Sequence, residues 1–315
     1  MARPSNWGRA FLSMAHFLGI DGGGMRTTAW LADERRMLAR AVAGPSNPLK
    51  VGFKASQREL IRAARTALRK AGLSHEKLDA VCVGLAGVDR PPVHRRLLRW
   101  LRRAIPSDAH LLASDAAIAL HAAVGDTPAA IVVSGTGSIA YGRDERGRAL
   151  RSGGWGTLFD DAGSGYDIGR KAIAAALRDF DGRGPRTRLR RKICRALGLE
   201  DITQVVLHPL TPQEIAGLFP LVLEAARKED HVARRLCDEA GRDLAELATA
   251  LIKRLALRRR RICVVCTGGV FRATLLVRRS FARHLRRSFS GARVILLRRH
   301  PVEGAVALAR DLARA

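Results

Sequence analysis

The stretch Phe17-Leu-Gly-Ile-Asp-Gly-Gly-Gly-Met-Arg-Thr-Thr28 leads from an apolar segment straight into a glycine-rich turn with hydroxyl residues. A second stretch of this kind, Ala130-Ile-Val-Val-Ser-Gly-Thr-Gly-Ser138, lies much further along the chain. A strand that ends in such a turn presents bare backbone N–H groups, which can approach a polyphosphate closely. Either turn alone is equally typical of a β-hairpin with glycine at positive φ. The pair indicates a nucleotide held between two similar halves.

The composition is that of an ordinary globular protein. The chain has 315 residues, enough for two domains, of which 47% are hydrophobic and 27% charged, as in soluble proteins. No apolar run is long enough to cross a membrane, so no membrane partner is expected. Residues 1–15 lack the apolar stretch of a secretory signal, and we expect them to be a disordered extension. Five cysteines without a paired framework predict free thiols and a cytoplasmic location.

The charge is unusual. The formal net charge is +27, and 48 of the 56 basic residues are arginine. One interpretation is a polyanion-binding surface, since phosphate neutralisation drives affinity for nucleic acids. The other is a solvated surface that is simply rich in arginine. No aromatic residues interleave with the basic helices, as base stacking would require. We therefore expect no specific nucleic-acid partner, and only incidental binding at low salt.

Strands alternate with helices along the chain, which predicts an α/β fold. The recurrence of strand, glycine turn and strand predicts a first domain over residues 16–127 and a second over residues 128–301. Expected strands cover residues 16–22, 27–32, 37–43, 80–86, 129–134, 262–267 and 294–297. Expected helices cover residues 53–71, 91–104, 163–179, 186–197, 212–228, 230–257 and 272–288.

Further motifs accompany the two glycine turns. They are Gly44-Pro-Ser-Asn47, Ser114-Asp-Ala-Ala117, Gly153-Gly-Trp-Gly156, Asp161-Ala-Gly-Ser164, Thr267-Gly-Gly269 and His300-Pro-Val-Glu-Gly-Ala305. In this order they resemble the sugar kinases of the actin, hexokinase and heat-shock-ATPase superfamily. More closely, the chain resembles the N-acetylglucosamine kinases of the BadF/BadG/BcrA/BcrD-type ATPase family. The resemblance implies two actin-like, ribonuclease-H-like domains with a nucleotide cleft between them. It also implies a final helix, over residues 302–315, that packs back on the first domain.

The resemblance implies ATP as the phosphoryl donor, with Mg²⁺ as its metal. Backbone N–H groups and hydroxyls of both turns are the expected phosphate ligands, and a third glycine turn would let adenine and ribose approach the backbone. These nucleotide-binding residues are Gly22, Gly23, Gly24, Thr27, Gly135, Thr136, Gly137, Gly268, Gly269 and Arg272. Asp21 ends the first strand, where we expect it to orient Mg²⁺ through water. A turn-capping aspartate is the alternative interpretation.

Asp115 is the expected general base. In the family, the aspartate of this motif takes the proton of the sugar's 6-hydroxyl, although a helix start is also a common place for a capping aspartate. Such a base depends more on correct placement than on a shifted pKa. Sugar recognition is expected from an amide, an aromatic face and glycine-rich backbone. These substrate-binding residues are Asn47, Asp115, Gly154, Trp155, Gly156 and Asp161.

Two positions differ from the family pattern. Met25 stands where a threonine is usual, and Ala162 stands where a glutamate is usual. The predicted activity is ATP-dependent phosphorylation of N-acetylglucosamine to N-acetylglucosamine 6-phosphate by a homodimer. Glucosamine, N-acetylmuramic acid or glucose is the alternative substrate.

Other classes of protein remain as alternatives. A non-enzymatic polyanion-binding or regulatory protein on a kinase scaffold is the main one. An iron–sulfur dehydratase activator is disfavoured, because Cys263 and Cys266 point to opposite faces of a strand. The repressor/open-reading-frame/kinase family is disfavoured because its zinc-binding cysteine cluster is missing.

Overall fold

The computed structural model of the protein describes residues 14–74, 76–257 and 262–314. The chain divides into two compact units. The first unit comprises residues up to Ala122 together with those from His300 onward, and the second comprises Ala123–Arg299. Residues 1–15 were predicted to be a disordered extension, and residues 1–13 of that segment lie outside the described residues.

The first unit is built on a five-stranded sheet in the order β3-β2-β1-β4-β5. The strands are β1 (Phe17–Gly22), β2 (Thr27–Ala32), β3 (Met37–Ala43), β4 (Leu78–Leu85) and β5 (Ser107–Ala113). β1 pairs antiparallel with β2 and parallel with β4, and β4 pairs parallel with β5. Because parallel strands share one direction, the carboxyl ends of β1, β4 and β5 lie at the same edge of the sheet.

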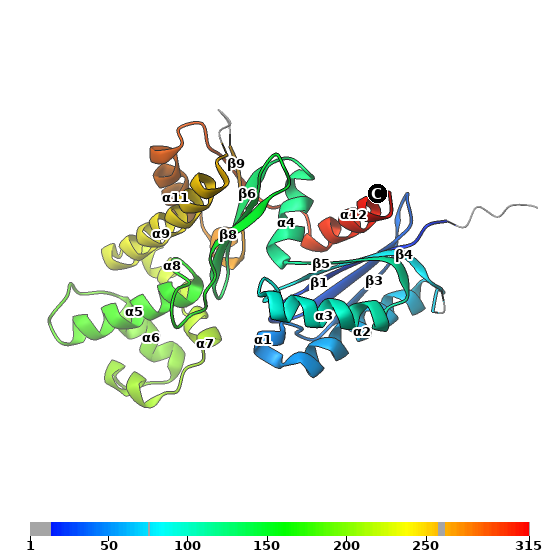
Figure 1. Ribbon diagram of the computed structural model, residues 1–315. Coiled ribbons are helices and arrows are strands. Elements are labelled where there is room, and N and C mark those ends of the chain that lie inside the picture. Colours follow the sequence, from blue (N-terminus) through cyan, green and yellow to red (C-terminus); the bar gives the residue numbers. More distant parts are fainter. Residues whose placement is uncertain (1–13, 75, 258–261, 315) are drawn as a thin grey trace, which may run out of the picture. The chain divides into compact units, whose positions relative to one another are not determined.

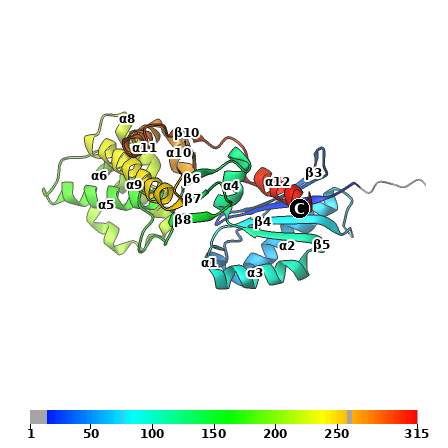
Figure 2. The same cartoon turned by 45° about the horizontal axis from the view of Figure 1, so that its top comes forward.

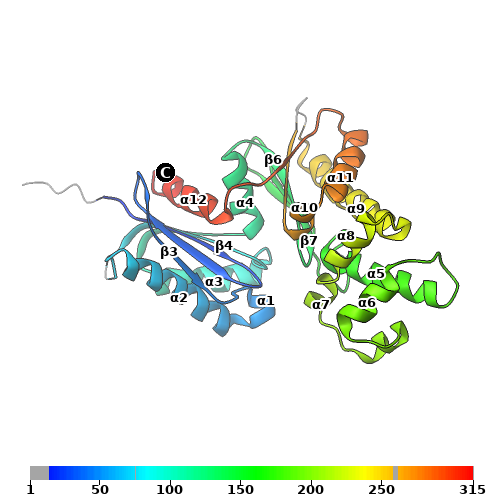
Figure 3. The same cartoon turned by 180° about the vertical axis from the view of Figure 1, so that it is seen from behind.

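Helices cover both faces of this first sheet (Figures 1 and 3). The short α1 (Pro48–Val51) leads into α2 (Phe53–Lys70), which packs with α3 (Pro91–Ala104) on one face. α4 (Asp115–Val124) and the C-terminal α12 (Pro301–Arg314) lie on the other face. A Cβ added at Gly304 would lie 2.0 Å from the Ile118 carbonyl oxygen, so α12 crosses α4 at a distance that only glycine permits.

The second unit repeats the topology of the first. Its sheet has the order β10-β9-β6-β7-β8. The strands are β6 (Ala129–Ser134), β7 (Ser138–Arg143), β8 (Ala149–Gly153), β9 (Cys263–Thr267) and β10 (Arg293–Leu296). β6 pairs antiparallel with β7 and parallel with β9, as β1 does with β2 and β4. The similarity predicted from the two glycine turns is therefore a similarity of whole sheets.

The helices of the second unit lie against its sheet (Figure 2), and all of them except the short helix Pro212–Ala216 contribute buried side chains to one hydrophobic core. They are α5 (Gly165–Phe180), α6 (Leu189–Leu197), the 3₁₀ helix η1 (Ile202–Leu207), α7 (Pro212–Ala216), α8 (Phe219–Arg227), α9 (His231–Leu255), α10 (Gly269–Ala273) and α11 (Leu275–Ser288). α9 and α11 approach closely at Gly241, where an added Cβ would lie 2.5 Å from the Ser280 Cβ. Among the described residues, none of the helices combines the length and the apolar character needed to span a membrane.

Two of the predicted helices are each divided in the structure. The helix expected over residues 212–228 is α7 and α8, because α7 ends at Gly217. The helix expected over residues 272–288 is α10 and α11, because Thr274 adopts an extended conformation and its hydroxyl accepts a hydrogen bond from the Leu276 N–H. β8 was not predicted, since its mostly half-exposed residues show no clear apolar alternation.

Candidate active site

Three segments meet at the carboxyl edge of the first sheet. The Ala86 N–H, just after β4, donates a hydrogen bond to the Gly22 carbonyl (3.0 Å). The N–H groups of Ser46 and Asn47 both donate to the Gly23 carbonyl (3.0 and 3.1 Å). The first glycine turn, the end of β4 and the 44–47 loop therefore form one connected backbone structure, which Asp21 and Asn47 share.

Thr27 was predicted to bind the nucleotide, but its position in the structure does not fit that role. Its side chain is fully buried, and its hydroxyl lies 2.7 Å from both the Gly44 carbonyl oxygen and the Ser46 hydroxyl. This hydroxyl thus ties the 44–47 loop to β2 and is not available to a phosphate. Thr27 is therefore not among the nucleotide ligands that we propose. Its contacts hold the 44–47 loop, and so position Asn47.

The exposed part of the first turn carries no hydroxyl but has cations close by. Met25 is 83% exposed at its tip. A Cβ added at Gly24 would lie 3.4 Å from the Lys50 Nζ, so the ammonium group rests against this glycine. Arg26 is exposed, and its charge counters the rise in the pKa of Asp21. Lys50 and Arg26 can therefore supply the positive charge that a phosphate needs here.

Asp115 begins α4 but is not its capping residue. The Ser114 hydroxyl accepts the hydrogen bond from the Ala117 N–H (3.1 Å), which is the usual capping interaction. The Asp115 carboxylate accepts a hydrogen bond from the adjacent Ala116 N–H (2.9 Å). Burial raises the pKa of Asp115 to about 6, and the negative charge of Asp89 adds to this rise. A carboxylate with such a pKa is suited to accept a proton near neutral pH.

Asp21 has a similarly perturbed carboxyl group. Burial raises the pKa of Asp21 to about 7, and the charge of Asp115 raises it further, against the opposing charge of Arg26. A carboxylate whose ionised state is disfavoured by a neighbouring carboxylate is stabilised by a cation beside it. This donor set fits a magnesium ion, which prefers carboxylate oxygens and retains several waters.

Asn47 also lies at this edge of the first sheet. Its Oδ1 accepts a hydrogen bond from the Leu49 N–H (3.0 Å) and caps α1. Gly87, at φ +84°, leaves room for this amide, since an added Cβ there would lie 2.8 Å from Oδ1. With Oδ1 engaged, the side-chain NH₂ of Asn47 is the group that can donate to a ligand.

A cavity adjoins the general-base candidate on the α3 side of the sheet. It has a volume of about 290 Å³ and lies between the end of β5 and the first turn of α3. Its polar lining comes from Asp89, His94, Arg95 and Ser114. The His94 Nε2 is 3.0 Å from the Leu112 carbonyl oxygen, which fixes the orientation of the ring. Arg95 is exposed at the mouth of the cavity.

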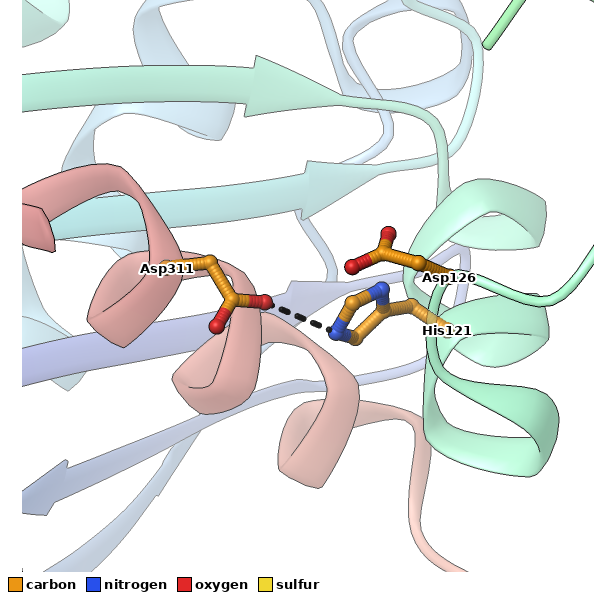
Figure 4. A group of neighbouring side chains, drawn as sticks. All are labelled: His121, Asp126 and Asp311. Carbon is orange, nitrogen blue, oxygen red and sulfur yellow. Dashed lines mark ion pairs between the residues drawn. The ribbon is translucent and has the colours of Figure 1, made fainter. Parts of the chain in front are cut away.

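Figure 4 shows an ion pair between α4, the helix that begins at Asp115, and α12. The His121 Nε2 on α4 lies 3.3 Å from an Asp311 carboxylate oxygen on α12. Asp126, also drawn there, belongs to the second unit, where its carboxylate pairs with Arg143 at 3.0 Å. The His121–Asp311 pair helps to hold α4, and with it Asp115, against the C-terminal helix.

The second glycine turn is held by a different segment. The Ser134 hydroxyl donates to the Gly163 carbonyl (2.9 Å), and the Ser138 hydroxyl donates to the Ala162 carbonyl (2.8 Å). The Gly165 N–H donates to the Gly135 carbonyl (2.8 Å). Between these anchors, Thr136 is half-buried and its hydroxyl has no hydrogen-bond partner among the described residues. The Thr136 hydroxyl is therefore available to a ligand.

Asp161 also differs from its predicted role. It was predicted to contact the sugar, but its side chain is buried beneath the second turn and is only 6% exposed. Its Oδ1 accepts a hydrogen bond from the Ser138 N–H (3.1 Å), and a Cβ at Gly137 would lie 2.7 Å from Oδ2. Its φ of +66° is a conformation that non-glycine residues rarely adopt. We therefore regard Asp161 as a positioning residue for the turn.

The predicted sugar-binding glycines and tryptophan form a projecting loop after β8. Gly154 and Gly156 have φ values of +72° and +101°, which favour glycine. Trp155, between them, is 59% exposed. The Arg151 guanidinium lies 4.1 Å from the centroid of the Trp155 ring and orients the indole by a cation–π interaction. An aromatic ring held in this way can offer its remaining surface to a sugar.

The third glycine turn lies beside the second. Gly268, at φ +99°, follows β9, and an added Cβ there would lie 2.1 Å from the Ser134 carbonyl oxygen. No atom lies within 4 Å of a Cβ added at Gly269 among the described residues, so this backbone is open to a ligand. The exposed Arg272 is held near the turn, with its Nη2 3.4 Å from the Thr267 hydroxyl.

Two five-stranded sheets of the same topology, each with a glycine turn after its first strand, define a protein of the actin-like ATPase class. The first unit provides Asp21, Asn47 and Asp115 at one sheet edge. The second provides two glycine turns at the corresponding edge of a sheet with the same topology.

Comparisons with known proteins agree with this class. The family model "BadF/BadG/BcrA/BcrD ATPase family" matches residues 18–309. The chain is 35% identical over 303 residues to an N-acetylmuramic acid/N-acetylglucosamine kinase of Clostridium acetobutylicum, covering 95% of this chain and 99% of that protein. It is 29% identical over 314 residues to an N-acetyl-D-glucosamine kinase of Dictyostelium discoideum, covering 95% and 98%.

Solved structures share the fold of this chain. A candidate N-acetylglucosamine kinase from Chromobacterium violaceum has a TM-score of 0.77 at 27% identity, covering 94% of this chain and 99% of that one. A ROK family glucokinase from Streptomyces griseus shares the fold, with a TM-score of 0.56 at 21% identity over 94% and 100% of the two chains. The chain belongs to the BadF/BadG/BcrA/BcrD ATPase family. The predicted two-domain α/β fold and the predicted enzyme class, an ATP-dependent sugar kinase, are confirmed.

Sequence reasoning missed several residues that shape the site. Glu59 accepts a hydrogen bond from the Gly44 N–H (2.8 Å) and so holds the 44–47 loop. A carboxylate on the buried, mostly apolar face of α2 is a signal that could have identified Glu59. Asp89, Lys50 and Arg151 act only through contacts made in the folded chain, and nothing in their sequence neighbourhoods distinguishes them.

Proposed function

We propose that this protein transfers the γ-phosphoryl group of ATP to the 6-hydroxyl of N-acetylglucosamine. The observation that carries the proposal is Asp115, a partly buried carboxylate that caps no helix and stands close enough to Asp21 for their charges to interact. The names of the relatives from Clostridium acetobutylicum and Dictyostelium discoideum support the choice of sugar.

Asp115 would accept the proton of the 6-hydroxyl as the sugar oxygen forms its bond to the γ-phosphorus. The bond from that phosphorus to the β,γ-bridging oxygen breaks, and ADP leaves. The Asn47 NH₂ would hold vicinal hydroxyls of the sugar, and Trp155 would pack against its apolar face. Positioning of this kind contributes a large part of the rate enhancement in phosphoryl transfer.

The phosphates would be held by open backbone and by hydroxyl groups. The Thr136 hydroxyl and the N–H groups of the second glycine turn are the groups we assign to them, with Gly22, Gly23 and Gly24 of the first turn, and Lys50 beside it. Gly268, Gly269 and Arg272 are assigned to the nucleoside end of ATP. Asp21 would hold Mg²⁺ through water, and that ion would neutralise charge on the phosphates. We also propose that the enzyme is a homodimer, which light scattering on the purified protein would test.

N-acetylmuramic acid is a second candidate substrate, and one feature of the first unit favours it. The cavity beside Asp115 has the exposed Arg95 among its lining residues. N-acetylmuramic acid differs from N-acetylglucosamine by a lactyl ether with a carboxylate, which is the chemistry an arginine binds best. The relative from Clostridium acetobutylicum is named for both sugars.

A coupled ADP-release assay tests both substrates. The panel contains N-acetylglucosamine, N-acetylmuramic acid, glucosamine, glucose and a reaction without sugar. We expect the two N-acetylated sugars to stimulate ADP release most strongly. Arg95→Gln should lower kcat/KM for N-acetylmuramic acid about tenfold and leave that for N-acetylglucosamine unchanged. The proposal is wrong if none of the sugars stimulates ADP release.

A further inference from the structure

The second unit contains a basic groove that is separate from every residue assigned to catalysis. The groove has a volume of about 960 Å³ and lies between the 185–188 loop, α6 and the turn from α8 to α9. Its basic lining residues are Arg186, Arg188, Arg190, Arg191, Lys192, Arg195, Lys228 and His231. Its acidic lining residues are Asp179, Glu224, Glu229 and Asp230.

Two of the acidic residues bind the backbone of the groove wall. The Asp230 carboxylate accepts hydrogen bonds from the Thr187 hydroxyl (2.9 Å) and the Arg188 N–H (2.6 Å). The Asp179 carboxylate accepts a hydrogen bond from the Thr187 N–H (3.2 Å). These contacts fix the 185–188 loop, and the hydrogen bonds that Asp230 accepts come from backbone N–H groups and the Thr187 hydroxyl. The loop is therefore held in one conformation before any ligand binds.

The other two acidic residues are paired with cations of their own. Glu224 pairs with both Lys192 and Lys228, and Glu229 pairs with Arg234 (3.2 Å). Four lining arginines remain exposed, and in the described part of the chain no carboxylate lies within ion-pair distance of them. We call them the groove arginines: Arg186, Arg188, Arg191 and Arg195.

Three groove arginines follow one side of α6. Arg188, Arg191 and Arg195 are spaced i, i+3 and i+7, which places them on one helix face. Leu189 and Ile193 bury the opposite face in the core. At a rise of 1.5 Å per residue, Arg188 and Arg195 are about 10 Å apart along the axis. A row of this length suits an extended chain of negative charges better than a single small anion.

We propose that this groove binds a phosphate chain, the chemistry shared by the backbone of single-stranded nucleic acid and by inorganic polyphosphate. Guanidinium groups bind phosphate oxygens in a bidentate manner, and arginine is favoured for this reason. The lining contains no tryptophan, tyrosine or phenylalanine to serve as a stacking platform, so we expect binding that is independent of sequence. The binding site is additional to the kinase site and does not depend on it.

Fluorescence anisotropy with a labelled single-stranded DNA of mixed sequence, over a series of salt concentrations, tests the proposal. The groove variant replaces the four groove arginines by glutamine. The control variant has the same change in charge on the first unit, at exposed arginines of α2 and α3. Its substitutions are Arg65→Gln, Arg69→Gln, Arg99→Gln and Arg102→Gln. Thermal unfolding of both variants checks that they remain folded.

The groove variant should bind at least about tenfold more weakly at low salt, and its slope of log K against log salt should fall by about 3, since each phosphate contact contributes about 0.7. The control variant should change that slope by less than about 1. An equal loss in both variants, or no loss in the groove variant, would show that net charge alone binds DNA and would overturn the proposal.

Competition experiments identify the source of the phosphate. Displacement of the DNA by inorganic polyphosphate would assign the groove to phosphate chains in general, and failure to displace it would assign the groove to nucleic acid. Polyglutamate carries carboxylates in place of phosphates. If polyglutamate displaces the DNA as effectively as polyphosphate, the assignment to phosphate is wrong.

Discussion

The two units of this protein share one sheet topology but use it for different chemistry. In the first unit, the threonine hydroxyl of the glycine turn is buried against the 44–47 loop, and the neighbouring edge carries the carboxylates Asp21 and Asp115. In the second unit, the turn is supported from below by Asp161, and the Thr136 hydroxyl stays unengaged among the described residues. A repeated fold therefore does not imply repeated roles: the first unit carries the general-base candidate, and the second carries the glycine turn whose threonine hydroxyl is open to a phosphate.

The largest effect is expected when the general-base candidate of the first unit, Asp115, is replaced. Asp115→Asn keeps the size and one acceptor oxygen of the side chain but cannot take up a proton. We expect kcat for sugar phosphorylation to fall by about 10³-fold, within the usual range for a general base. The coupled ADP-release assay measures this loss. Asp108→Asn, at an exposed residue of β5, is the matched control and should keep full activity.

The pH dependence of kcat/KM should be determined by the ionisation of a carboxylate in the first unit. Asp115 must be ionised to accept a proton, and burial raises its pKa to about 6. At saturating Mg²⁺, kcat/KM should therefore fall about tenfold per pH unit below pH 6 and level off above it. Asp89→Asn removes a neighbouring negative charge, so it should lower the pKa of Asp115 and move this acid limb to lower pH. An acid limb that stays in place in Asp89→Asn would contradict the assignment.

Stability should distinguish the two threonine hydroxyls. Thr27→Val removes a buried hydroxyl and leaves the Gly44 carbonyl and the Ser46 hydroxyl short of a partner, so the free energy of unfolding should fall by about 1–3 kcal/mol. Thr136→Val removes a half-buried hydroxyl that has no partner among the described residues, and the change should stay within about 0.5 kcal/mol. Urea unfolding of both variants gives the comparison. Equal losses would mean that the two turns are anchored alike.

The smallest expected effect comes from restoring a hydroxyl to the first turn. Met25 is exposed and its thioether cannot donate a hydrogen bond to phosphate. Met25→Thr should lower KM for ATP two- to fivefold, in line with about 0.5–1 kcal/mol for one added hydrogen bond. Met25→Val, which has nearly the same shape but no hydroxyl, should not. The same improvement in both variants would assign the effect to the loss of methionine.

Much of this comparison could be predicted from the sequence, because local signals determine it. The glycine turns follow apolar strands, and the order of the motifs indicated both the sugar-kinase class and Asp115. The roles of Thr27 and Asp161 could not be predicted, because they depend on partners 17 to 23 residues away that only folding brings near. The raised pKa of Asp115 likewise depends on burial and on Asp89, from a different strand end.

The most direct test of the division between the units is the KM for ATP in two matched variants, Thr27→Val and Thr136→Val. Each replaces one threonine of a glycine turn by an isosteric valine. We predict that Thr136→Val raises KM for ATP at least about tenfold, since it loses a hydrogen bond to a charged phosphate. Thr27→Val should keep the wild-type KM for ATP, since a smaller folded fraction lowers the maximal rate but leaves KM unchanged. The account is contradicted if Thr27→Val raises KM for ATP as much as Thr136→Val does, or if Thr136→Val leaves it unchanged.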